Sequence, residues 1–205
     1  MLSDDDAGRV VAAFDFDKTI STRDNVVPFI RAVVGRARLV RALVAISPRL
    51  VRAALVDDKR DAAKVALVRH TLTGRDAARV AEVGAEFARD VLARHLRPDV
   101  VDRVRWHRNR GDDVVIVSAS FRHYLDPIGA ELDASAVLAT ELAVDDDGRL
   151  TGELAGPNVR GAEKVRRLEE WLARDSCPAY IWAYGDSVGD RELLARADQP
   201  IKVGG

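Results

Sequence analysis

Two aspartates near the beginning of the chain stand at a spacing that suits paired acid chemistry. The sequence RVVAAFDFDKT places Asp15 and Asp17 directly after the apolar run Val10–Phe14. Such a run is typical of a buried β-strand, and residues that lie two apart in an extended chain point to the same side. We therefore expect both carboxyl groups to face one spot at the end of a strand, with Phe16 turned away.

Further polar residues follow other apolar runs. Ser118 comes after the second run, and Asp186 and Asp190 come after the fourth. In an open parallel sheet, ligands bind outside the carboxyl ends of the strands. We therefore expect these side chains to gather beside Asp15 and Asp17.

A cluster of carboxylates of this kind favours the binding of a hard cation. Converging carboxylates repel one another, which raises the pKa of at least one of them, and a cation relieves that repulsion. Oxygen ligands with few protein contacts suit Mg²⁺. The four histidines and the single cysteine, Cys177, form no zinc-like spacing. The sequence thus predicts a magnesium site.

The elements that must position these residues alternate between strand and helix. The predicted strands are Val10–Phe14, Val114–Val117, Ala136–Ala139, Tyr180–Tyr184 and Ile201–Val203, and the helical patterns include Pro98–Arg110 and Gly161–Arg174. Alternation of this kind favours a parallel sheet that is covered on both faces. The fold class predicted is therefore α/β, with a Rossmann-like parallel sheet as its core.

One long segment interrupts the alternation. Residues 23–96 contain apolar positions at helical spacing and no convincing strand. We predict that they form a helical cap inserted after the first strand, while residues 1–22 and 97–205 form the catalytic core. A hairpin is expected around the turn DDDG, between Leu142–Val144 and Arg149–Thr151.

Composition excludes several classes of function. The chain has 205 residues, 47% of them hydrophobic, and a net charge of −1. These values are ordinary for a globular protein and indicate no nucleic-acid partner. A single cysteine rules out an internal disulfide and suits a reducing compartment. The opening residues MLSDDDAG do not resemble a secretory signal, so we expect a cytoplasmic protein; the sequence predicts no oligomeric state.

Four short motifs occur in order along the chain: DFDKT, VSAS, GAEKV and YGDSVGD. Together they resemble the four motifs of the haloacid dehalogenase superfamily of phosphatases. The helical insert and the hairpin are similar to those of its phosphoserine-phosphatase-like branch, subfamily IB, whose insert is called a C1-type cap. The resemblance spans the whole chain.

The resemblance implies a role for each matching residue. Asp15 would attack phosphorus and become an aspartyl phosphate, and Asp17 would protonate the leaving alcohol and then activate water. Ser118 and the backbone N–H of Ala119 would bind phosphate oxygens. Lys164 would neutralise charge on the phosphoryl group in flight.

A cofactor follows from the same resemblance. Mg²⁺ would be held by the side chains of Asp15 and Asp186 and by the backbone carbonyl of Asp17, while Asp190 would anchor Lys164 or the water shell of the metal. The function implied is Mg²⁺-dependent hydrolysis of a small phosphorylated metabolite, a phosphomonoester.

The identity of the substrate depends on Asp24. Phosphoserine phosphatases carry a glutamate at this position, nine residues after the nucleophile, which reads the ammonium group of the substrate. Asp24 is one methylene shorter, and it also stands where a residue could cap the first helix of the insert. We favour capping, which argues against phosphoserine, and we retain phosphoserine or histidinol phosphate as alternative substrates.

A second alternative is a peripheral membrane protein that acts on phospholipid head groups. Between Arg23 and Arg69 the chain has eleven Lys or Arg residues and four Asp residues. If Leu39–Val56 formed one helix, Arg38, Arg41, Arg49 and Arg52 could share a face, which is typical of interfacial helices. Because Pro48 splits that segment, we favour a protein without membrane contact.

Overall fold

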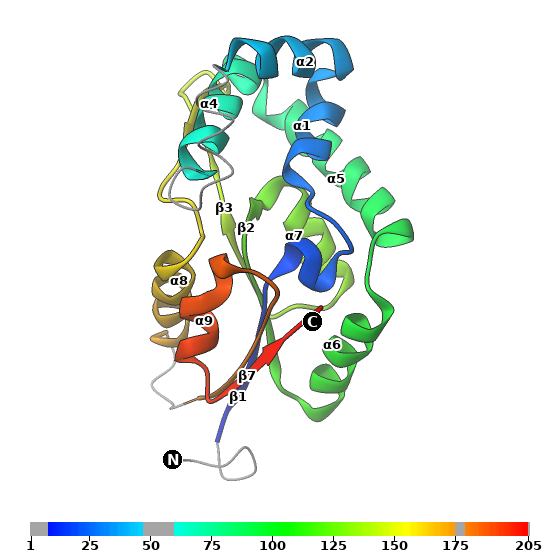
Figure 1. The fold of residues 1–205 in the computed structure, drawn as a ribbon, viewed down its shortest axis with the longest axis vertical. Helices are drawn as coiled ribbons and strands as arrows, with labels where there is room; N and C mark the ends of the chain where they lie inside the picture. Colours follow the sequence, from blue (N-terminus) through cyan, green and yellow to red (C-terminus); the bar gives the residue numbers. More distant parts are fainter. Residues whose placement is uncertain (1–7, 47–59, 175–178, 205) are drawn as a thin grey trace.

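Strands and helices alternate along most of the chain in the computed structural model, which describes residues 8–46, 60–174 and 179–204 (Figure 1). The strands are β1 (Val10–Phe14), β2 (Asp113–Phe121), β3 (Ala136–Thr140), β4 (Leu142–Val144), β5 (Leu150–Leu154), β6 (Tyr180–Gly185) and β7 (Gln199–Lys202). The helices are α1 (Val26–Val34), α2 (Arg36–Ala45), α4 (Arg60–Leu72), α5 (Ala77–Arg94), α6 (Pro98–Arg110), α7 (Arg122–Glu131), α8 (Ala162–Leu172) and α9 (Arg191–Arg196).

Five strands form one parallel sheet in the order β3-β2-β1-β6-β7. β1 lies in the centre, where Val11 pairs with Asp113 of β2 on one side and Ile181 of β6 on the other. The predicted α/β fold with a Rossmann-like parallel core is confirmed. Because the strands are parallel, their carboxyl ends meet at one edge of the sheet, which is where the acidic motifs lie.

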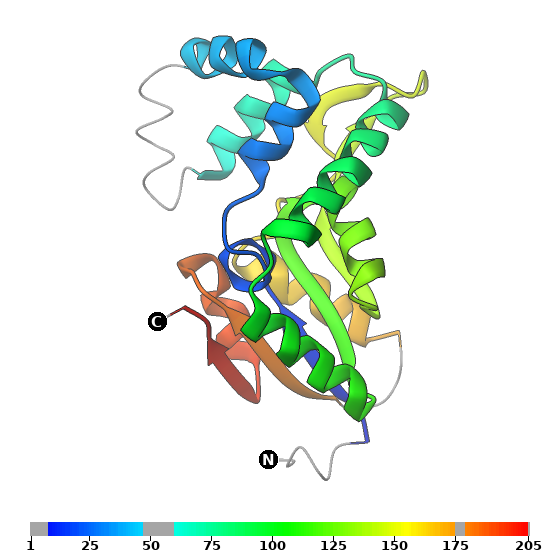
Figure 2. The same cartoon turned by 90° about the vertical axis from the view of Figure 1, so that its right-hand side faces the viewer.

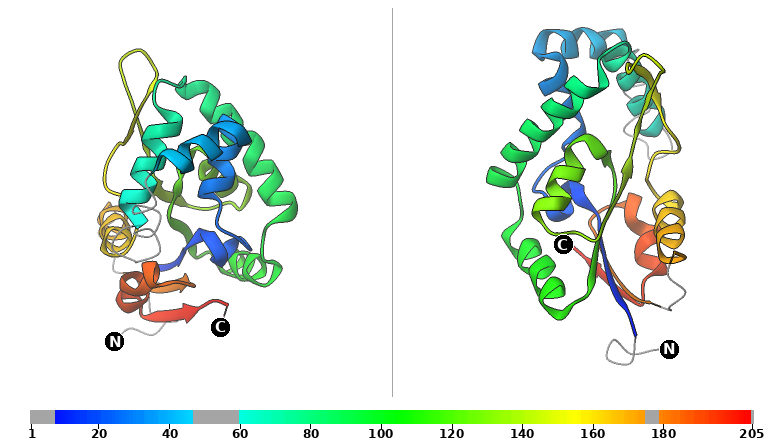
Figure 3. Two further views of the ribbon diagram at one scale, coloured as in Figure 1. Left: turned by 45° about the horizontal axis from the view of Figure 1, so that its top comes forward. Right: turned by 180° about the vertical axis from the view of Figure 1, so that it is seen from behind.

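The apolar side chains of β1 divide between two cores, one on each face of the sheet. Val11 and Ala13 belong to a core that also contains Leu168 of α8 and Leu193 of α9. Ala12 and Phe14 point to the opposite face, into the core that α6 and α7 complete. Figure 3 shows α8 and α9 on one side of the sheet and α6 and α7 on the other. The strand is buried on both faces, which explains its continuous apolar sequence.

Helices α1, α2, α4 and α5 lie between β1 and α6 in the sequence. In space α1, α2 and α4 lie beyond the end of the sheet, and α5 runs back from them alongside α7 (Figure 2). The chain enters and leaves this group through two adjacent segments. Thr22 donates its backbone N–H to His95 (2.8 Å), and Arg97 donates to Ile20 (2.8 Å). The paired crossing lies beside the boundaries, 23 and 96, that the sequence predicts for the cap.

The predicted hairpin is present as β4 and β5, which pair in antiparallel fashion. It contacts the linker between α4 and α5, where Gly74 donates to Leu150 (2.7 Å) and Leu150 donates to Arg75 (2.8 Å). It also contacts the first residue of α5, since Ala77 donates to Gly148 (2.9 Å). The hairpin therefore links the strands of the core to the inserted helices.

Helix α7 is not among the helical patterns named from the sequence, and it contains Pro127 in its interior. Of the segment Leu39–Val56, the residues up to Ala45 belong to α2, and its continuation with Pro48, Arg49 and Arg52 lies outside the described residues. Among the described residues, every helix is too short or too polar to cross a bilayer.

The close approach of α5 to α7 generates a stability prediction. A Cβ on Gly84 would lie 2.2 Å from the backbone oxygen of His123, so the two helices would have to separate. We expect Gly84→Ala to lower the free energy of unfolding by about 1–3 kcal/mol, measured by urea denaturation. Gly156→Ala is the control, since its Cβ would meet only the end of the Arg167 side chain at 3.3 Å. Equal stability of the two variants would contradict the prediction.

Candidate active site

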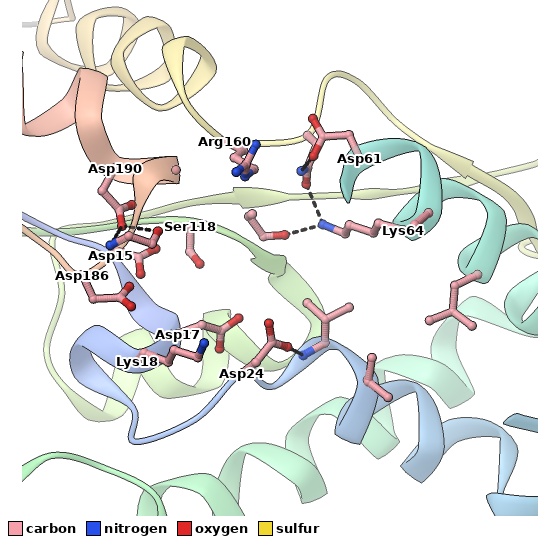
Figure 4. A pocket seen from close by; sticks show the side chains of 18 of the residues that line it. Asp15, Asp17, Lys18, Asp24, Asp61, Lys64, Ser118, Arg160, Asp186 and Asp190 are labelled. Carbon is pink, nitrogen blue, oxygen red and sulfur yellow. Dashed lines mark hydrogen bonds between the residues drawn. The ribbon is translucent and has the colours of Figure 1, made fainter. Parts of the chain in front are cut away.

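A buried lysine joins two carboxylates at the carboxyl edge of the sheet. The Nζ atom of Lys164, in the first turn of α8, donates to Asp15 Oδ1 (2.5 Å) and to Asp190 Oδ1 (2.5 Å). Lys164 is 2% exposed and Asp190 1%. Three motifs that are distant in the sequence therefore meet at one ammonium group. Figure 4 shows the side chains of Asp15 and Asp190 close together on its left side.

The charges of Lys164, Asp15 and Asp190 determine which of these side chains carry a proton. Burial alone would lower the pKa of Lys164, but the two carboxylates outweigh it and raise that pKa. Burial likewise acts to raise the pKa of Asp190, yet Lys164 and Ser187 hold it below the usual value. For Asp15 burial dominates over the attraction of Lys164, and its pKa is raised. Lys164 therefore stays protonated, and the carboxylate of Asp15 beside it is more basic than an ordinary aspartate.

Asp186 extends the acidic cluster toward solvent. Carboxylate oxygens of Asp15, Asp186 and Asp190 all lie within 4.8 Å of one another. Burial raises the pKa of the half-buried Asp186, and the neighbouring charge of Asp190 raises it further. Lys164 and Lys18, which both act on Asp186, do not balance three carboxylates, and all the donors are oxygens. This donor set fits Mg²⁺.

Asp17 lies on the same side as Asp15 but is held by different partners. Its Oδ1 accepts from the backbone N–H (3.1 Å) and Nδ2 (2.7 Å) of Asn25, and its Oδ2 accepts from Ser120 Oγ (2.5 Å). Burial, reinforced by the charge of Asp24, raises the pKa of Asp17 to about 7 although these hydrogen bonds oppose the shift. A carboxyl group with this pKa can both give and accept a proton near neutral pH.

The backbone turns sharply between the two motif aspartates and the inserted helices. In the turn Phe16–Ile20, Lys18 has a φ of 61°, which is uncommon for a residue other than glycine. Ser21 donates its N–H to Phe16 (2.9 Å) and closes the turn. The turn directs Asp17 away from the strand axis, toward Asn25.

Ser118 and Ala119, at the end of β2, lie in the same pocket as the acidic cluster. Ser118 is 1% exposed, and its Oγ accepts from the backbone N–H of Ser120 (3.2 Å). The structure thus brings together all the residues that the sequence singled out: Asp15, Asp17, Asp24, Ser118, Ala119, Lys164, Asp186 and Asp190 line one pocket.

Asp24 both contacts the first inserted helix and borders the pocket. Its Oδ1 accepts from the backbone N–H of Val26 (3.1 Å), at the first residue of α1. The N-cap position itself belongs to Asn25, one residue later than the sequence suggested, and the side chain of Asn25 turns to Asp17 instead of to the helix. Asp24 therefore satisfies a free N–H of the helix from the residue before the cap.

Sequence reasoning missed a group of residues that reaches the pocket from α4. Lys64 Nζ donates to the carbonyl oxygen of Ala119 and to Asn158 Oδ1 (2.6 Å), and it lies 4.5 Å from the ring centre of Phe121. Asn158 Nδ2 donates to Asp61 Oδ1 (2.7 Å). No spacing along the chain connects these residues, since they meet only in space.

The pocket has a volume of about 440 Å³, which is within the range of small-molecule sites. The core contributes Asp15, Lys164, Asp186 and Asp190, and the inserted helices contribute the opposite wall, which includes Asp61 and Lys64 of α4. Figure 4 shows Asp24 and Lys64 on the side away from Asp15 and Asp190.

Comparisons with known proteins agree with this architecture. The model of the haloacid dehalogenase-like hydrolase family matches residues 12–195. Protein CicA of Caulobacter vibrioides is 36% identical over 190 residues, covering 93% of this chain and 84% of its own. A Mycobacterium tuberculosis protein named "probable phosphatase" is 30% identical over 191 residues, covering 91% of this chain and 66% of its own.

Solved structures share the fold. A protein of unknown function from Bordetella pertussis superposes with a TM-score of 0.78 at 28% identity, covering 95% of this chain and 89% of its own. An apo phosphoserine phosphatase superposes with a TM-score of 0.63 at 18% identity, covering 92% and 83%. At this identity the second match speaks for the fold alone.

The Lys164 cluster generates a prediction on stability and pH. Lys164→Met leaves Asp15 and Asp190 buried without their cation, which typically costs about 3–5 kcal/mol. The carboxyl pKa values in the folded variant then lie above those of the unfolded chain, so the loss of stability grows as the pH rises above about 4. Urea unfolding at pH 5 and pH 8 should show a larger deficit at pH 8. Lys202→Met, at an exposed position in β7, is the control, and an equally small effect of both would contradict the prediction.

Proposed function

The chain belongs to the family of haloacid dehalogenase-like hydrolases and is a phosphatase, and we propose that it hydrolyses a small phosphomonoester through an aspartyl-phosphate intermediate. The observation that carries this proposal is the pairing of two unlike carboxyl groups in one pocket. Burial raises the pKa of both, to about 6 for Asp15 and about 7 for Asp17. The two groups differ in their partners: Asp15 is bound to the ammonium group of Lys164, whereas Asp17 is bound to neutral donors. This difference supports a division between nucleophile and acid–base, because only the group without a cationic partner is free to exchange a proton.

In the first step a carboxylate oxygen of Asp15 forms a bond to phosphorus while the ester P–O bond breaks. Asp17, protonated, gives its proton to the departing alkoxide oxygen. The ammonium group of Lys164 offsets negative charge as it moves between the nucleophile and the leaving group, and the Ser118 hydroxyl with the N–H of Ala119 donates to phosphate oxygens.

In the second step Asp17, now ionised, accepts a proton from water as the water oxygen attacks phosphorus. The bond between phosphorus and Asp15 breaks, which releases inorganic phosphate and restores both carboxyl groups. Ser120 and Asn25 keep the Asp17 side chain in one orientation through both steps, because they bind both of its oxygens.

We infer that Mg²⁺ is held by the side chains of Asp15 and Asp186 and by the backbone carbonyl of Asp17. When bound, the ion shields the anionic nucleophile from the anionic phosphate. The unbalanced charge of the Asp15, Asp186 and Asp190 cluster supports this assignment. Asp190, whose Oδ1 binds Lys164 and whose Oδ2 accepts from Ser187, positions the lysine.

Substitution of each catalytic aspartate by asparagine tests the two roles. Asp15→Asn should reduce the release of phosphate from every substrate to background and abolish labelling by a ³²P-phosphomonoester, because an amide is not a nucleophile. Asp17→Asn should lower kcat by about 10²–10⁴-fold and still allow labelling. The labelled protein should lose its phosphate to hydroxylamine. Near-normal activity of Asp15→Asn on any good substrate would overturn the assignment of the nucleophile.

Metal binding separates the roles of Asp186 and Ser118. Asp186→Ala removes a direct anionic ligand, so it should weaken Mg²⁺ binding by about tenfold or more. Ser118→Ala should leave Mg²⁺ affinity nearly unchanged and raise the KM of the phosphomonoester. Mg²⁺ titrations by calorimetry without substrate, compared with the Mg²⁺ dependence of activity, measure both effects. Equal Mg²⁺ affinities of the two variants would count against the metal site.

A further inference from the structure

The wall of the pocket opposite the acidic cluster carries a group of apolar side chains. Helices α1, α2 and α4 supply this wall, and α4 adds the charged side chains of Asp61 and Lys64. The apolar side chains, including that of the residue after α2, are Val26, Val27, Leu43, Ile46, Ala63 and Leu67. The phosphate end of the same pocket is charged. A ligand whose phosphate lies beside Asp15 and Lys164 would therefore extend its other end toward hydrocarbon.

The polar groups on this side already have partners within the protein. Asp24 accepts from the N–H of Val26, and Asp61 accepts from Asn158. Lys64 donates to the carbonyl oxygen of Ala119 and to Asn158. Their bonds join the helices to one another and to the core, and these groups are engaged before a ligand enters.

Two of the apolar side chains retain considerable exposed surface. Val27 and Leu43 are each 41% exposed, although large apolar side chains are more often buried in a folded protein. Both border the pocket, and covering their surface with hydrocarbon is favourable. An apolar group in the pocket would supply that cover, whereas a polar group placed against Val27 and Leu43 would lose water without gaining a partner from these two side chains.

From this wall we infer that the phosphomonoester taken by the site carries an apolar organic group, alkyl or aryl, which packs against Val27 and Leu43. The inference rests on the proposed phosphatase function for the position of the phosphate. It assigns the substrate class and disfavours the amino-phosphates that an amine-reading Asp24 would select. Specificity then comes from the area of hydrocarbon covered rather than from an ion pair.

A series of n-alkyl phosphates measures how the length of the apolar group affects kcat/KM. From methyl to pentyl phosphate, below their micelle concentrations and with Mg²⁺ present, kcat/KM should rise by about three- to fourfold per methylene until the pocket is filled. Pentyl phosphate and 4-aminobutyl phosphate have equal numbers of heavy atoms and differ in one terminal group. Pentyl phosphate should be the better substrate by at least about tenfold.

Matched variants test whether Val27 and Leu43 cause the dependence of kcat/KM on chain length. Leu43→Asn and Val27→Thr should lower the ratio of the pentyl to the methyl kcat/KM by about three- to tenfold each. Val44→Asn is the control, because Val44 is 76% exposed on the same helix α2 and does not line the pocket. Its ratio should remain that of the unchanged protein. A fall in the ratio for all three variants would indicate a general loss of structure and overturn the assignment.

Binding of n-alkyl phosphonates separates this inference from the proposed function, because their P–C bond is not hydrolysed. Calorimetry with Mg²⁺ should show Kd falling from methyl- to pentylphosphonate. Hydrolysis without a dependence on chain length, or a preference for 4-aminobutyl phosphate, would overturn the inference and leave the phosphatase function standing. If phosphonate binding depends on chain length but no phosphomonoester is hydrolysed, the proposed phosphatase function is overturned and the apolar binding site stands.

Discussion

The buried ammonium group of Lys164 is the interaction on which the rest of the site depends. It binds two carboxylates that come from the first strand and from the turn after the sixth, and charges can be buried at tolerable cost only when they are paired and hydrogen-bonded. The sheet order makes this possible, since β1 and β6 are neighbours and end at the same edge. Helix α8 then needs to bring its first turn to that edge, which its packing through Leu168 achieves.

The inserted helices are joined to the core on two sides of the pocket. Near Asp17, the two crossing segments pair with each other through backbone hydrogen bonds. On the far side, Lys64 reaches the backbone of Ala119 and shares Asn158 with Asp61. Asn25 also ties the first inserted helix to the carboxyl group of Asp17. The helices that form the apolar wall therefore also set the orientation of the acid–base group.

Sequence reasoning reached the sheet and the charged half of the pocket because both have local signals. The periodicity of a strand alone predicts that Asp15 and Asp17, two residues apart after an apolar run, lie on the same side. The partners of Asp17 were missed, although Ser120 lies two residues after Ser118 and Asn25 directly after Asp24. Lys64 had no signal at all: its position depends on the path of two helices, and one lysine in a basic segment resembles the others. Helix α7 was not among the helices named from the sequence, and it has Pro127, a residue that usually interrupts a helix, in its interior.

The central place of β1 has a consequence for how the chain reaches this structure. Its two neighbours in the sheet, β2 and β6, follow it by about 100 and about 170 residues. At a synthesis rate of about 5–20 residues per second, β1 leaves the ribosome roughly 10 to 30 seconds before β6. The inserted helices, whose contacts are more local, can form during that interval, whereas β1 lacks β2 for the first part of it and β6 until its end. The core can therefore close only late in synthesis, and the apolar surface of this short strand stays incompletely covered until then.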